Sequence, residues 1–118
     1  MKLPTVLKSA ALALLISAGA SAANAASFDC NRARLPDEKA ICADRALNDQ
    51  DVRLSLLYGI VLRIVGMGER DSLRDSQTYW LRMRHACGAN RACIARAYAT
   101  RIADYDRIMQ RMYANAPF

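Results

Sequence analysis

Apolar residues recur every three or four positions along most of this chain, which is the spacing of one face of an α-helix. The clearest segment is predicted to begin near Asn90, because asparagine is favoured as a helix N-cap. Its apolar stripe consists of Cys93, Ile94, Ala97, Tyr98, Ile102, Tyr105, Ile108, Met109 and Met112. We expect these tyrosines and methionines to pack in a core rather than to bind a cofactor.

Two further long helices are predicted upstream. The first covers about residues 49–65 and is expected to end at Gly66-Met67-Gly68. Gly59 inside it costs about 1 kcal/mol relative to alanine, which indicates a close contact with another helix. The next helix is expected to begin near Ser72 and to end at Cys87-Gly88. Its stripe consists of Leu73, Gln77, Trp80, Leu81 and Arg84.

A short leading helix is predicted from Pro36 to about Cys42. Proline is favoured in the first turn of a helix, and Asp37 and Glu38 would lie at its positive end. Few segments alternate between apolar and polar residues, so strands are not expected.

The first 25 residues have the pattern of a secretory signal peptide. Lys2 and Lys8 provide a positive start, and residues 10–20 are apolar but too short for a membrane span, which needs about 20 residues. Ala23-Asn24-Ala25 predicts cleavage after Ala25. We therefore expect a signal peptide over residues 1–25 and a single exported domain over residues 26–118. That domain would be periplasmic or secreted, without a transmembrane segment.

Four cysteines in an exported chain predict two disulfides. Pairing neighbours, Cys30 with Cys42 and Cys87 with Cys93, closes the shortest loops, but spacing alone leaves all three connectivities open. A zinc site is disfavoured because His85 is the only histidine and no Cys-x-x-Cys occurs. We expect no metal and no cofactor. The predicted fold class is all-α, a small disulfide-stapled bundle of three main helices plus a short leading helix.

The charge of the mature chain is uneven. Residues 26–118 contain 15 basic and 11 acidic groups, a net charge of +4, and 14 of the 15 are arginines. Residues 76–118 carry seven arginines against two aspartates. Arginine richness suits nucleic acid, but the signal peptide directs the chain elsewhere and no recognition motif occurs. Nucleic-acid binding is therefore not expected.

Two groups of residues, taken together, resemble a known family. In the first half these are Phe28-Asp29-Cys30, Glu38-Lys39-Ala40-Ile41-Cys42-Ala43-Asp44, Leu47, Asp51, Leu54 and Tyr58. In the second half they are Gln77, Trp80-Leu81, Arg84, Cys87, Cys93, Tyr98 and Arg101. Over roughly residues 28–105 their order and spacing resemble the N-terminal domain of the LprI lysozyme-inhibitor family, small helical proteins of bacterial envelopes.

The resemblance implies export, a disulfide within each cysteine pair, no catalysis, and inhibition of animal-type lysozyme. The chain departs from the family pattern at three points. His85 stands where an acid is frequent, Gln50 stands where an aliphatic residue is common, and Ser27-Phe28-Asp29 does not form a lipobox before Cys30. We therefore expect no lipid anchor.

The residues that carry the resemblance are candidates for structural or binding roles. They are Asp29, Glu38, Asp51, Tyr58, Gln77, Trp80, Arg84, Tyr98 and Arg101. We expect Trp80 to fill the core, and Gln77 and Arg84 to pair with helix-end groups. The aspartates are expected to cap helices or pair with arginines. His85 is expected to be an exposed helix-end residue, and without a nucleophile and base in sight we expect no enzyme.

Two functions follow as hypotheses. In the first, the protein binds animal-type lysozyme, and an inserted arginine pairs with the carboxylates of the saccharide cleft. Because that enzyme is also basic, binding would need local acids that face it. The candidates are Asp37, Glu38, Asp44, Asp49 and Asp51. In the alternative, the chain is an envelope interaction module that binds anionic envelope components or another periplasmic protein.

Overall fold

The computed structural model describes residues 26–117. The predicted signal peptide, residues 1–25, lies outside this range. The described part consists of a 3₁₀ turn, η1, and four α-helices, with no strand among these residues. Their bounds are η1 Cys30–Arg32, α1 Pro36–Ala43, α2 Arg45–Ile64, α3 Met67–Ala86 and α4 Arg91–Ala114. The prediction of an all-α bundle with three main helices and a short leading one is confirmed.

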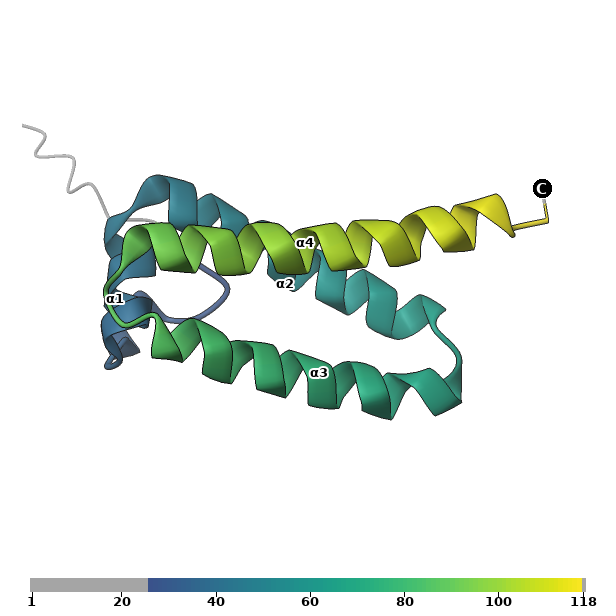
Figure 1. The fold of residues 1–118 in the computed structure, drawn as a ribbon, viewed down its shortest axis with the longest axis horizontal. Coiled ribbons are helices and arrows are strands. Elements are labelled where there is room, and N and C mark those ends of the chain that lie inside the picture. Colours follow the sequence, from purple (N-terminus) through teal and green to yellow (C-terminus); the bar gives the residue numbers. More distant parts are fainter. Residues whose placement is uncertain (1–25, 118) are drawn as a thin grey trace, which may run out of the picture.

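The helices run up, down and up again, with α1 across one end (Figure 1). The most extensive contact joins α2 and α4, and α3 packs on α4. The short α1 touches all three long helices. The turn between α2 and α3 lies at the opposite end, where α4 extends to the C-terminus (Figure 1). No helix of residues 26–117 is long and apolar enough to cross a membrane.

The apolar stripes of the helices meet in one core. Tyr98 and Tyr105 of α4 are fully buried, as are Ile41 of α1 and Val61 of α2. Met109 packs at the edge of this core, whereas Met112 is 40% exposed. The core role predicted for the stripe of α4 is therefore correct up to Met109.

Two helices begin earlier than predicted. Asp44 caps α2 by accepting hydrogen bonds from the backbone N–H groups of Ala46 and Leu47, so the helix starts at Arg45 rather than near residue 49. Helix α3 starts at Met67, five residues before the predicted cap at Ser72. Gly68 consequently lies in the first turn of α3 and does not stop a helix.

Gly59 and Gly88 lie in different backbone settings, one inside α2 and one after the end of α3. A Cβ atom at Gly59 would meet nothing within 4 Å, so the close helix contact predicted there is wrong. Gly88 has a φ of 55°, the left-handed conformation typical of the residue after a helix C-cap. The predicted end of the third helix at Cys87-Gly88 is therefore correct.

Both disulfides join neighbouring cysteines. One links Cys30 with Cys42 and ties η1 to α1, and the other links Cys87 with Cys93 across the loop between α3 and α4. The pairing implied by the family resemblance is confirmed, and no free cysteine occurs in residues 26–117. On the chain-entropy account each loop of this size adds about 2–3 kcal/mol to the free energy of unfolding.

Candidate functional site: a buried polar network and its pocket

An ion pair between Asp37 and Arg84 lies inside the bundle. Asp37 comes from the first turn of α1 and is 0% exposed, and Arg84 comes from the last turn of α3 and is 4% exposed. The guanidinium Nε donates to Asp37 Oδ2 over 2.8 Å. Burial of either charge alone would be costly, and the pair compensates both. Asp37 was expected only to favour the positive end of a helix, and sequence reasoning missed its buried role.

The network continues through Tyr98 to Asp51. Arg84 Nη1 donates to the Tyr98 hydroxyl over 3.1 Å, and that hydroxyl donates to Asp51 Oδ1 over 2.8 Å. The second Asp51 oxygen accepts a hydrogen bond from the backbone N–H of Ser27 at 2.6 Å. Because Asp37, Arg84, Tyr98 and Asp51 belong to α1, α3, α4 and α2, one hydrogen-bonded chain connects all four helices.

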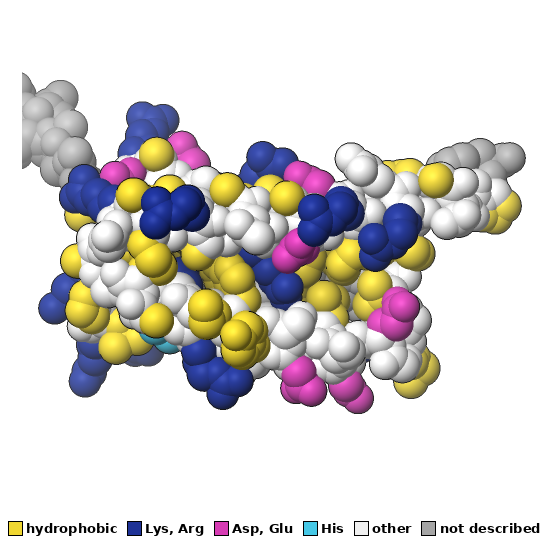
Figure 2. All heavy atoms as spheres, viewed as in Figure 1, with side chains coloured by type: hydrophobic (Ala, Val, Ile, Leu, Met, Phe, Trp, Pro, Cys, Tyr) yellow, Lys and Arg dark blue, Asp and Glu magenta, His cyan; other side chains and the backbone are white. Residues whose placement is uncertain are grey.

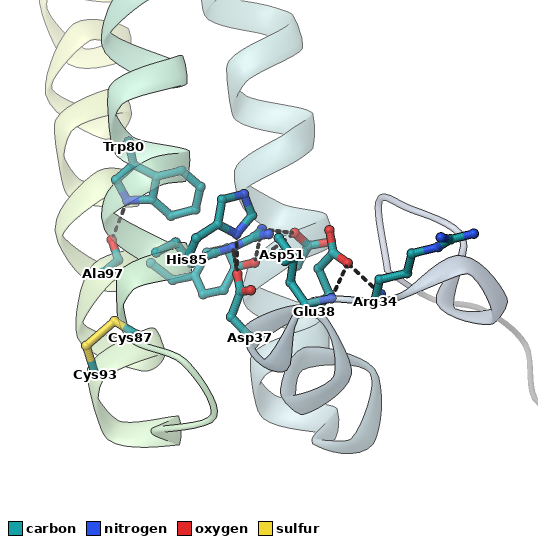
Figure 3. A network of polar contacts seen from close by, with 12 residues as sticks. Arg34, Asp37, Glu38, Asp51, Trp80, His85, Cys87, Cys93 and Ala97 are labelled. Atoms are coloured by element: carbon teal, nitrogen blue, oxygen red, sulfur yellow. Dashed lines mark hydrogen bonds and ion pairs between the residues drawn. A yellow bond between two sulfur atoms is a disulfide. The ribbon is translucent and has the colours of Figure 1, made fainter.

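His85 joins this network from its edge. Its Nδ1 lies 2.8 Å from Asp37 Oδ2, and its side chain is 34% exposed (Figure 3). His85 lies at a helix end, as expected, but it is only partly exposed, because Asp37 holds the ring against the bundle. The sequence carried one usable signal: an arginine on the apolar stripe of α3 requires a buried carboxylate as partner.

Burial and mutual contacts shift the pKa values of Asp37, Arg84 and Tyr98. Burial opposes ionisation of Asp37, but the hydrogen bonds from His85 and Arg84 outweigh burial and hold its pKa below the ordinary value. Burial likewise acts against the charge of Arg84, yet Tyr98 and Asp37 raise its pKa. Burial also raises the pKa of Tyr98 well above that of a free tyrosine. Tyr98 thus remains a hydrogen-bond donor between two charged groups.

A second cluster joins α3 to the middle of α4. Gln77 Oε1 accepts hydrogen bonds from Arg101 Nε at 3.0 Å and from the Tyr105 hydroxyl at 2.5 Å. The Arg101 guanidinium also lies 4.6 Å from the centre of the Tyr105 ring, and Tyr58 stacks on that ring at 6.1 Å. Burial raises the pKa of Tyr105 to about 12. Gln77 therefore binds side chains in mid-helix, and its expected pairing with a helix-end group is wrong.

Trp80 fills the core, as expected, and is 9% exposed. Its Nε1 donates to the carbonyl of Ala97 over 3.0 Å (Figure 3), and its ring tilts against Tyr98 with centroids 5.2 Å apart. Trp80 thus fixes the spacing between α3 and α4 by both packing and a hydrogen bond.

Two further acidic side chains, Glu38 and Asp29, accept hydrogen bonds from nearby backbone N–H groups. Glu38 Oε2 accepts hydrogen bonds from the backbone N–H groups of Arg34 and Leu35, at 2.9 and 3.1 Å. These two bonds hold the pKa of Glu38 below its ordinary value. Asp29 caps η1 by accepting from the N–H of Asn31 at 2.9 Å. The capping role expected for the aspartates is correct for Asp29.

A pocket of about 350 Å³ opens above the network, between α2 and α3. Six of the nine predicted site residues line it: Glu38, Asp51, Tyr58, Gln77, Trp80 and Arg84. Tyr98 and Arg101 contact those residues from α4, whereas Asp29 lies apart. The Arg84 guanidinium sits 5.8 Å from the ring centres of both Phe28 and Trp80. The structure thus brings eight of the nine predicted residues together.

The Asp37–His85 pair resembles part of a catalytic site. An Asp–His pair is two thirds of a hydrolytic triad, but among the described residues no hydroxyl or thiol hydrogen-bonds to His85. No group of three or more His, Cys, Asp or Glu side chains that could hold a metal occurs in residues 26–117. The hydrogen bonds of the network fix the positions of the four helices relative to one another.

These features define a class, the small disulfide-stapled helical bundle organised around a buried Asp–Arg–Tyr–Asp network. The chain belongs to the lysozyme inhibitor LprI family, whose model matches residues 30–116. No curated protein and no solved structure matches the chain. The matched range contains both disulfides and every residue of the network except Ser27 and Phe28 at its edge.

Proposed function

We propose that this chain is an exported, non-catalytic protein that binds and inhibits animal-type lysozyme. The observation that carries this proposal is the match of the lysozyme inhibitor LprI family model over residues 30–116. Export is supported by the N-terminal pattern of residues 1–25 and by two disulfides, which form and persist in oxidising compartments.

The proposal is further supported by the rigidity that the network and disulfides provide. An inhibitor that blocks a cleft gains affinity when its contact surface is already fixed before binding, because less conformational entropy is lost. Here two disulfides and a network that spans α1 to α4 fix the bundle.

The acids once expected to face lysozyme do not form such a surface. Asp37 and Asp51 are buried, and Glu38 and Asp44 are committed to capping backbone N–H groups. Of these five acids only Asp49 is exposed. The attraction must therefore come from a different, local arrangement of charge, while the net charges of the two proteins repel each other at long range.

Calorimetric titration of oxidised protein 26–118 into animal-type lysozyme tests this proposal. We expect saturable one-to-one binding in the low micromolar range or tighter, with a lower Kd at physiological than at low salt, because salt screens the net repulsion. A reduced and alkylated sample is the matched control and should bind more weakly. Absence of binding at low micromolar concentration, in both salts, would contradict the proposal.

One observation favours a second candidate, an envelope module that binds anionic components. The end of the molecule where α1 lies presents the exposed basic side chains Lys39, Arg45, Arg82, Arg91 and Arg96. Sedimentation with vesicles that contain anionic lipid tests it. Salt-sensitive retention of the oxidised protein would support this function, and equal behaviour with neutral vesicles would remove it.

A further inference from the structure

A short, fixed loop joins α3 to α4 at one end of the bundle (Figure 1). The Cys87–Cys93 disulfide closes it, and Figure 3 shows it at the same end as Asp37 of α1. The backbone N–H of Gly88 donates to the carbonyl of His85, and that of Asn90 to Cys87, at 3.0 and 3.2 Å. Residues 89–92 are all exposed. We call residues 87–93 the tip.

The tip presents one long side chain. Gly88, Ala89 and Ala92 have small side chains or none, and Asn90 Oδ1 is turned back to accept a hydrogen bond from the N–H of Cys93 at 3.0 Å. Arg91 alone in this loop combines length and charge, and its side chain is 61% exposed. The loop therefore presents a single exposed guanidinium among small side chains.

Arg91 can change partner at little cost. Its Nη1 lies 3.3 Å from Asp44 Oδ2 in an exposed ion pair, a kind of pair that contributes little to stability. Asp44 would not be left unsatisfied, because its other oxygen caps α2 through Ala46 and Leu47. The guanidinium of Arg91 is thus available to a carboxylate of another molecule.

The surroundings of the tip are also basic. Residues 36–48 and 82–96 contain six Lys and Arg but three Asp and Glu, and one charge of each sign cancels in the buried Asp37–Arg84 pair. Figure 2 shows Lys and Arg side chains around this end of the molecule. A basic surface of this kind complements an acidic surface on a partner.

We propose that the tip is the inhibitory element: it enters the saccharide cleft of lysozyme, where Arg91 pairs with the cleft carboxylates. Such a cleft holds two carboxyl groups about 5 Å apart, and a planar guanidinium can donate to both. Pairing inside the cleft explains how a chain of net charge +4 engages a basic enzyme, since the attraction is confined to the cleft. The inference rests on the proposed function and assigns it to one loop.

Inhibition of cell-wall lysis by oxidised variants tests the inference. Arg91→Glu should weaken inhibition at least about tenfold, because it places an acid against the cleft carboxylates. Arg91→Lys should have a smaller effect, since it keeps the charge but loses the bidentate geometry. Arg111→Glu is the matched control, because it makes the same charge change on an exposed residue at the other end of α4, and should alter inhibition less than twofold.

The calorimetric titration is repeated with an N-acetylglucosamine oligosaccharide that fills the cleft, which should compete with binding of the wild-type chain. Equal inhibition by wild type and Arg91→Glu, an equal loss with Arg111→Glu, or binding unaffected by the oligosaccharide would each overturn the role of the tip while inhibition itself stands. A wild-type chain that does not inhibit would overturn the proposed function, and the tip hypothesis with it. Unchanged helical circular dichroism and thermal midpoints verify that the variants fold.

Discussion

Arg84 is the side chain on which the buried network depends most. It donates to Asp37 and Tyr98 at 2.8 and 3.1 Å and lies 3.8 Å from Asp51. Loss of its guanidinium would leave two carboxylates in the interior without their cation. Such uncompensated burial costs far more than the pair itself contributes.

We therefore predict that Arg84→Ala lowers the free energy of unfolding by about 3–5 kcal/mol. Urea unfolding followed by circular dichroism measures this change. Arg82→Ala, on the exposed side of the same helix, is the control and should change the value by no more than about 0.5 kcal/mol. If the two variants lose stability equally, the buried ion pair does not have the importance assigned to it.

The lowered pKa of Asp37 gives stability a definite dependence on pH. Its folded pKa lies below the unfolded value of about 3.9, so the unfolded state binds the proton more readily. The contribution is fully present above the unfolded pKa and is lost as the pH falls through the folded one. Unfolding free energies measured from pH 6 to pH 2 should fall at the acid end, and Asp37→Asn should flatten this decline. Asp49→Asn, at an exposed position, should leave the slope unchanged; an equally flat profile for it would contradict the assignment to Asp37.

At the scale of elements, the two disulfides act on different parts of the bundle. Cys87–Cys93 closes a loop with a sequence separation of 6 between two long helices that also pack on each other. Replacing both cysteines by alanine should lower the free energy of unfolding by about 2–3 kcal/mol while the helical content is kept. Denaturant unfolding and circular dichroism of the double variant measure both quantities. A variant that has lost its helices would show that the disulfide is needed for the fold rather than for its stability.

The helices themselves were predictable because their apolar stripes are long and regular. Their starting points were less so. The capping of α2 by Asp44 was open to sequence reasoning, yet Gly66 and Gly68 together suggested a longer break than the one that exists. Eight of the nine site residues meet in space, but nothing in the local sequence distinguishes Asp37, which is buried, from Glu38 beside it, which caps α1. That difference depends on the position of Arg84 of α3 beside Asp37, which the tertiary structure sets and the local sequence does not.

At the scale of the whole molecule, the network links all four α-helices, and the two ends of the bundle differ in the side chains that they expose. The hydrogen-bonded chain from Asp37 to Asp51 passes through α1, α3, α4 and α2, so these helices should unfold together. The basic tip lies at one end, and the exposed apolar residues Met67, Met112 and Tyr113 belong to the ends of helices at the other (Figures 1 and 2). A rigid body with one basic end suits docking on an acidic site of a partner.

The most direct measurement is a titration of animal-type lysozyme activity with oxidised protein 26–118 at physiological ionic strength. If the chain is an inhibitor of the kind described, activity should fall in proportion to added protein and reach its minimum near one equivalent, and reduction with alkylation should weaken the effect. Full lysozyme activity in the presence of excess folded, oxidised protein would contradict the account.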